Sequence, residues 1–216
     1  MSTTLLQLRT KARRYLDESS ADRWTDAEIT AYVNESILWL QGMIERSNSD
    51  WFLRVETFTA VSGASGAAFP SDVWGNRIRG LWCYPGQTAA VGQGYRIAPG
   101  QLEWVMENLH YSASQPDNYI YHAGYVRWAP LLSTSSCFRY IYAKKETPLS
   151  ADVDVMDRIM DQHADLVAMY AAKIAYEKVG ANTVFLENRI DRGLLQMRSD
   201  VRSSDVITLP QANIDG

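Results

Sequence analysis

Residues 24–40 read WTDAEITAYVNESILWL and carry the strongest local structural signal in the chain. Thr25 and Glu28 have the spacing of a capping box, in which each side chain bonds to the backbone N–H of the other at the start of a helix. The apolar residues that follow keep helical spacing until Ser47. We therefore predict a helix that begins at Thr25 and ends near Ser47.

A shorter helix is predicted just before this one. Between residues 4 and 16, Leu5, Leu8 and Ala12 fall on one stripe at a spacing of three and four. A polar loop over residues 17–23 then connects the two helices. Residues 1–50 are therefore predicted to form a helical hairpin.

Residues 51–147 differ in composition from the rest of the chain. They hold 17 of the 24 aromatic residues and nine of the 13 glycines, and polar and apolar residues alternate from Leu53 onward. Such alternation is typical of strands, and the glycines are typical of turns between them. We predict a small antiparallel sheet or barrel with a short helix over residues 102–109. Further strands are expected at residues 78–83, 95–98, 119–122, 125–128 and 138–143.

Residues 148–202 return to a helical pattern. Acidic residues at the start favour a long helix that runs to about Val179 and ends at Gly180, and Asn182 or Thr183 can cap a last helix. Small residues on the long helix let a neighbouring helix approach closely; they are Ala168, Ala171, Ala172 and Ala175. The predicted fold class is α+β: an antiparallel helical bundle from both chain ends, an inserted small antiparallel β-domain, and an extended C-terminal tail over residues 203–216.

Composition excludes several classes of protein. The net charge of −4 gives no overall attraction to nucleic acid, so a free-standing DNA-binding domain is not expected. The longest apolar run, residues 166–172, is far too short to span a membrane, and no signal peptide precedes it, so we expect a soluble, unsecreted protein. Cys83 and Cys137 lack the spacing of a zinc site or a disulfide scaffold, and we expect them half-buried in strands.

Searches for metal and cofactor chemistry find weak signals only. His163 has no second metal ligand at a suitable spacing, and Gly92-Gln93-Gly94 lacks the downstream residues of a phosphate loop. An acidic series could attract a cation but lacks the glycine and glutamate of a calcium loop, so a solvated helix face explains it more simply; it comprises Asp152, Asp154, Asp157, Asp161 and Asp165. We predict no catalytic residue, cofactor or metal.

Two interpretations of the middle block remain open beside a structural one. Glu103 and Glu107 lie one helical turn apart near Trp104, and a glycosidase-type carboxylate pair could be built from them. The aromatic residues, including Trp104 and Trp128, could also stack on sugars. Sheet core and subunit contacts account for these aromatic residues more simply.

The order and spacing of several short motifs resemble a known family. The motifs are Trp24-Thr25-Asp26-Ala27-Glu28-Ile29, Phe69-Pro70-Ser71-Asp72, residues 119–130, Tyr140-Ile141-Tyr142 and Thr147-Pro148-Leu149-Ser150. Together with the alanine-rich helix, they resemble the head-to-tail adaptor (connector) proteins of tailed bacteriophages, with the podovirus-type tail adaptors closest in architecture. The aromatic-rich insertion departs from the purely helical members.

The resemblance implies a structural virion protein rather than an enzyme. It implies a homo-oligomeric ring, a dodecamer, beneath the portal protein, which extends the DNA channel and carries tail tube, nozzle or fibre proteins. DNA would pass transiently without sequence-specific binding, and assembly would take place in the host bacterial cytoplasm. The resemblance places the portal contact in the tail, at Val206, Ile207, Thr208, Leu209 and Pro210, and the four alanines of the long helix suit a subunit interface. The alternatives are a peptidoglycan-hydrolysing tail protein and a tail-associated carbohydrate-binding module.

Overall fold

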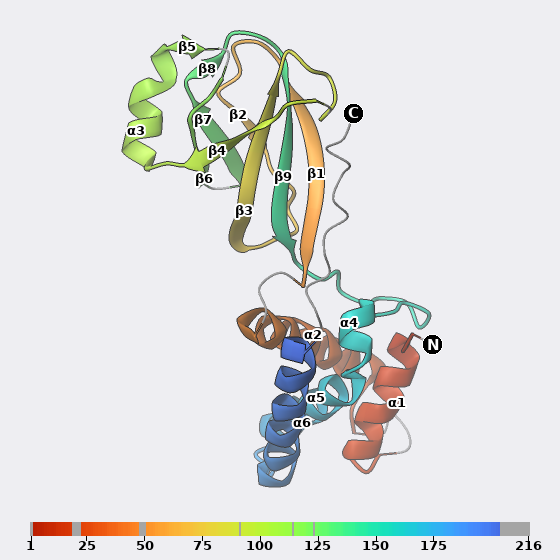
Figure 1. The fold of residues 1–216 in the computed structure, drawn as a ribbon. Helices are drawn as coiled ribbons and strands as arrows, with labels where there is room; N and C mark the ends of the chain where they lie inside the picture. The colour runs from red at the N-terminus through yellow and green to blue at the C-terminus, as the bar shows by residue number, and fades with distance from the viewer. Residues whose placement is uncertain are drawn as a thin grey trace. The chain divides into compact units, whose positions relative to one another are not determined.

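The structure is a computed structural model, and the residues it describes are 2–18, 23–47, 51–90, 92–113, 115–122 and 124–203. The chain folds as two compact units, one made by residues 1–51 with 146–216 and the other by residues 52–145. The first unit is helical and the second consists mostly of strands (Figure 1). The α+β class predicted from the sequence is therefore confirmed.

The helical unit draws its elements from both ends of the chain. Among the described residues its helices are α1 (Leu5–Tyr15), α2 (Asp26–Ser47), α4 (Arg158–Asp161), α5 (Ala164–Lys178) and α6 (Val184–Ser203). The predicted capping box starts α2: the Glu28 N–H donates to Thr25 Oγ1 over 3.2 Å, and the Thr25 N–H donates to Glu28 Oε2 over 2.9 Å. A second capping box, made by Thr4 and Gln7, starts α1.

Helix α5 forms the centre of this unit and contacts α1, α2 and α6. Its buried surface includes Leu166 and Val167, and Gly193 of α6 lies against Leu166 so closely that an added Cβ would overlap that side chain. Glycine at position 193 therefore lets α6 approach α5. Gly180, with φ of +67°, follows α5, and Asn182 Oδ1 accepts the Val184 N–H at the start of α6, as predicted.

The prediction of one long helix after residue 150 was wrong. Helix α4 ends at Asp161, and α5 begins only at Ala164, after His163. Upstream, the chain is held against the start of α1, where the Leu5 N–H donates to the Asp154 carbonyl over 2.8 Å. The carbonyls of Asp152 and Asp154 accept N–H groups of α1, so they are not available as acceptors within a helix of their own. The helical region therefore begins only after this segment.

The second unit contains a seven-stranded sheet in the order β1-β9-β3-β4-β6-β7-β2 and a two-stranded pair of β5 with β8. The strands are β1 (Leu53–Ala60), β2 (Gly66–Ala68), β3 (Val73–Pro85), β4 (Tyr95–Pro99), β5 (Ser112–Ala113), β6 (Asn118–His122), β7 (Tyr125–Ala129), β8 (Leu131–Leu132) and β9 (Ser136–Lys144). The predicted short helix appears as α3 (Leu102–Glu107) with a 3₁₀ turn, η1 (Asn108–His110).

The sheet is not wholly antiparallel, which corrects the prediction. β4 pairs with β6 in parallel, and β5 pairs with β8 in parallel. Parallel neighbours need a crossover connection, and α3 with η1 lies in the connection between β4 and β6. The alternation of polar and apolar residues along a strand shows which face of that strand is buried. It does not show whether the neighbouring strand runs parallel or antiparallel to it.

Aromatic residues form much of the core on one face of the sheet. The Phe58 ring of β1 stacks on Phe138 of β9 with 5.0 Å between centroids, and Phe138 stacks on Trp128 at 4.5 Å. Tyr140 and Tyr142 also lie in this core and donate their hydroxyls to Glu56 over 2.7 and 3.1 Å. These aromatic residues therefore form part of the sheet core.

Cys83 and Cys137 are fully buried rather than half-buried as predicted. They lie on β3 and β9, which are interior strands of the sheet. Cys83 belongs to the aromatic core, and burial raises the pKa of its thiol. On the other face, Arg139 next to Cys137 donates to the Ala90 carbonyl over 3.0 Å, so the loop after β3 covers this part of the sheet.

Candidate assembly surfaces

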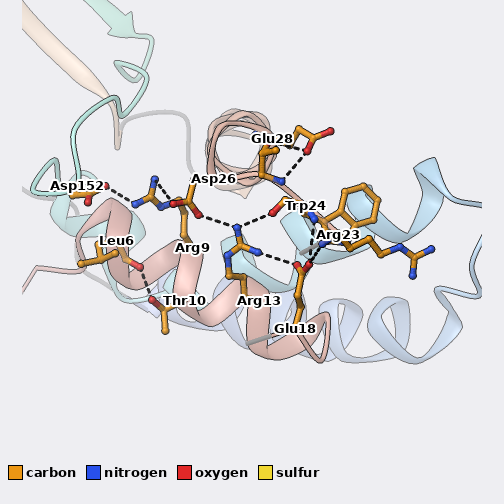
Figure 2. A network of polar contacts seen from close by, with 11 residues as sticks. Leu6, Arg9, Thr10, Arg13, Glu18, Arg23, Trp24, Asp26, Glu28 and Asp152 are labelled. Carbon is orange, nitrogen blue, oxygen red and sulfur yellow. Dashed lines mark hydrogen bonds and ion pairs between the residues drawn. The ribbon is translucent and has the colours of Figure 1, made fainter. Parts of the chain in front are cut away.

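Arg13 is the centre of a polar network that joins α1 to the start of α2 (Figure 2). Its Nη1 donates to Glu18 Oε2 over 2.9 Å, and its Nη2 donates to the Trp24 carbonyl and to Asp26 Oδ1, each over 2.8 Å. Glu18 Oε1 in turn accepts the backbone N–H groups of Arg23 and Trp24. The network therefore fixes the entry of the chain into α2.

Arg9, one turn earlier on α1, extends this network to the segment before α4. Its Nη2 donates to Asp152 Oδ1 over 2.5 Å, and its Nη1 lies 3.9 Å from Asp26 Oδ2. The hydrogen bond from Arg13, supported by the charge of Arg9, holds the pKa of Asp26 below its usual range although partial burial opposes this. Each of these charges is matched by an opposite charge of the same unit, so the network builds the fold and does not present a reactive group.

The acidic series does not form one helix face. The break before α5 separates its members, and three of them have partners elsewhere in the helical unit. The partners are Arg9 for Asp152, the Thr3 N–H for Asp161 at 2.6 Å, and Lys11 for Asp165 at 2.8 Å. Asp154 accepts the backbone N–H groups of Ala151 and Ser150, which lowers the pKa of its carboxyl. The acidic residues therefore bind groups at or near α1, and Asp154 stabilises the turn that begins at Ser150.

No group of three or more metal-ligating side chains occurs among the described residues. His163 lies half-buried at the break before α5, and burial lowers the pKa of its imidazole. Its backbone carbonyl accepts the Leu166 N–H over 2.9 Å. The structure therefore gives His163 a position at a helix junction and no metal partner in the part of the chain it describes.

Glu103 and Glu107 are both exposed on α3. A neighbouring pocket of about 380 Å³ is lined by Trp104 and by residues of β4 and β6, but by neither glutamate. Trp104 is 39% exposed, whereas Trp128 is fully buried and donates its Nε1–H to the Ala64 carbonyl over 3.0 Å. Of Trp104 and Trp128, only Trp104 can therefore meet a ligand.

The four alanines expected at a subunit interface lie inside the helical unit. Ala168, Ala171, Ala172 and Ala175 are fully buried on α5. The close helix approach predicted for them takes place within one chain, because α1, α2 and α6 pack around α5. Since this surface is already covered, we assign no subunit contact to these residues.

Two exposed helix faces were missed by the sequence reasoning. On α6, Phe185 and Leu195 are exposed together with arginines, while Leu186 and Ile190 of the same helix are buried. On α2, Glu28, Ala31 and Glu35 are exposed. The signal was present in the helical periodicity, but only the packing shows which faces stay uncovered.

The proposed portal contact, Val206 to Pro210, lies outside the described residues. Among the residues that the structure describes, no helix is long and apolar enough to cross a membrane.

Comparison with known proteins places the chain in a family. The family model described as SU10 adaptor protein matches residues 3–209, nearly the whole chain. The protein is therefore a phage structural protein of the adaptor type. More particularly, the chain belongs to the SU10 adaptor protein family. A search among curated proteins finds no match.

Proposed function

We propose that this protein is a head-to-tail adaptor of podovirus type, which forms a ring beneath the portal, extends the DNA channel and carries the tail or tail fibres. The observation that supports this proposal is the match to the SU10 adaptor protein family across residues 3–209. The matched residues belong to both units, so the family assignment covers the helices and the sheet.

In this proposal the helical unit is the ring-forming part. Its helices α1, α2, α5 and α6 act as an antiparallel bundle whose outer faces meet the neighbouring subunits. A ring closes when each subunit offers two different surfaces, one to each neighbour, at a rotation that returns to the start. The unit fills its own centre with α5, so those surfaces are on the other helices.

The tail supplies the portal contact. Val206 to Leu209 are apolar or β-prone, and Pro210 follows them. A short segment of this kind can add a strand to an exposed sheet edge or fill an apolar groove on a partner. The partner is the portal protein, and DNA passes through the ring in transit without sequence-specific contacts. The protein acts in the virion after assembly in the host bacterial cytoplasm.

The experiment is a mass measurement of the protein alone and mixed with the portal ring from the same genome. Twelve chains of 24.4 kDa, the number that the resemblance implies, would add about 293 kDa to the portal. Removal of residues 203–216 is expected to abolish this shift while leaving the fold intact. A second variant replaces the same residues with a Gly/Ser stretch of equal length, which separates the effect of the tail's sequence from the effect of its length. A portal mass that stays unchanged with the wild-type protein would contradict the adaptor role.

A further inference from the structure

The outer face of α6 has the composition of a protein interface. Two large apolar side chains, Phe185 at 68% and Leu195 at 66%, are exposed on it. Arg189 and Arg192 are exposed on the same side as Phe185, and the Arg189 guanidinium lies 5.3 Å from the centroid of the Phe185 ring. Aromatic residues and arginine are the types enriched in protein interfaces, so this face has the composition of one.

The outer face of α2 carries acidic residues, whereas the outer face of α6 carries arginines. Glu28, Ala31 and Glu35 are exposed there, and no lysine or arginine occurs between Asp26 and Glu45. Within the part of the chain that the structure describes, Glu35 makes no hydrogen bond or ion pair, and the same holds for Arg192. One face therefore offers arginines and bulky apolar groups. The other offers the Glu35 carboxylate beside a small side chain, while Glu28 Oε2 already accepts from Thr25 and Lys178 lies near enough to act on its charge.

The two faces point in different directions. Helices α2, α5 and α6 contact one another pairwise, so the uncovered side of each is turned away from the other two. One chain cannot bring its own α2 and α6 outer faces together. Two copies can do so in a head-to-tail contact, and contacts of this kind generate rings when the rotation closes.

We propose that the outer face of α6, made by Phe185, Arg192 and Leu195, docks on the outer face of α2, made by Glu28, Ala31 and Glu35, of a second copy of this chain. The inference rests on the proposed ring and identifies the surfaces that close it. The arginines meet the carboxylates, and the apolar side chains cover the small residue between them.

The test uses two full-length variants, each with one face blocked. Ala31→Arg with Glu35→Arg blocks the α2 face, and Phe185→Ser with Arg192→Glu blocks the α6 face. Arg14→Glu, an exposed charge reversal on α1, is the matched control. Self-association is followed by sedimentation velocity from about 1 to 200 µM, a range in which weak contacts are populated, and helix content is checked by circular dichroism.

We expect each blocked variant to self-associate at least 100-fold more weakly than the wild type, and the control to behave as the wild type. A mixture of the two blocked variants is expected to give one species of twice the 24.4 kDa chain mass, because each variant retains the face that the other needs. This outcome is specific to a head-to-tail contact.

Three results would overturn the inference: a wild-type protein that stays monomeric throughout, blocked variants that assemble normally, or a mixture that gives no dimer. Loss of duplex DNA binding in the Arg192→Glu variant with normal assembly would assign the arginines to DNA instead. Failure here is distinguishable from failure of the adaptor role, because the portal mass shift of the wild-type protein is measured separately.

Discussion

Arg13 and Glu18 form an ion pair with 2.9 Å between Nη1 and Oε2, and each side chain is only 11% exposed. Arg13→Met should lower the free energy of unfolding by about 3 kcal/mol, since it leaves the Glu18 carboxylate buried without its cation. Chemical denaturation measures this change. Lys11→Met, which breaks a more exposed pair with Asp165, should cost less than about 0.5 kcal/mol. Equal effects of the two substitutions would contradict the structural role of the Arg13 network.

Acid stability should depend on Asp26. The hydrogen bond from Arg13 and the charge of Arg9 hold the pKa of this carboxyl in the folded protein below its unfolded value. Its contribution to stability is therefore complete above the unfolded pKa, near 4, and is lost as the pH falls through the folded pKa. Asp26→Asn should reduce the fall in unfolding free energy between about pH 5 and pH 3. In an Arg13→Met background the same substitution should have little effect, and an unchanged effect there would show that Arg13 is not the cause.

Trp128 and Trp104 should respond differently to truncation. Trp128→Ala removes a fully buried ring that stacks on Phe138, and it should cost about 3–5 kcal/mol of unfolding free energy. Trp104→Ala should cost less than about 1 kcal/mol, because that ring is partly exposed on α3. Thermal or urea unfolding of both variants gives the comparison. Binding to a glycan array that is lost only with Trp104→Ala would revive the carbohydrate-binding alternative.

Enlarging an alanine of α5 should destabilise the single chain rather than the assembly. Ala172→Leu adds volume where α5 is surrounded by α1, α2 and α6, and should cost about 1–3 kcal/mol. Ala27→Leu, at an exposed position of α2, is the control and should be close to neutral. The measurement is thermal unfolding at a concentration where the protein is monomeric. A weaker assembly with unchanged monomer stability would return Ala172 to a subunit contact.

Local features of the fold were predictable from the sequence. The capping box of Thr25 and Glu28, the end of α5 before Gly180 and the strand that begins at Leu53 all appear where the sequence predicts them. Such features depend on residues within one or two turns of each other, or on alternation along one strand. The resemblance to phage adaptors likewise rested on the order of short motifs, and the family match supports it at the level of an adaptor-type protein.

The candidate sites were predicted less well. The alanines of α5 were expected at a subunit contact and are buried in their own chain, and Trp128 was offered as a stacking residue and lies in the sheet core. The exposed faces of α2 and α6 were not recognised. The alanines and Trp128 were noticed by residue type, but the sequence does not say which neighbouring residues cover a side chain and which side chains stay exposed.

By itself, the sequence determined the position of α1, α2 and β1 to within a few residues, the α+β class, and an adaptor-type identity, because these follow from short-range patterns. Only the tertiary structure decided the break at His163, the parallel pairing of β4 with β6, the burial of Cys83 and Cys137, and the uncovered faces of α2 and α6. These depend on contacts between residues far apart in the chain. The Leu5 N–H, for example, finds its acceptor at Asp154 only when the two ends of the helical unit meet.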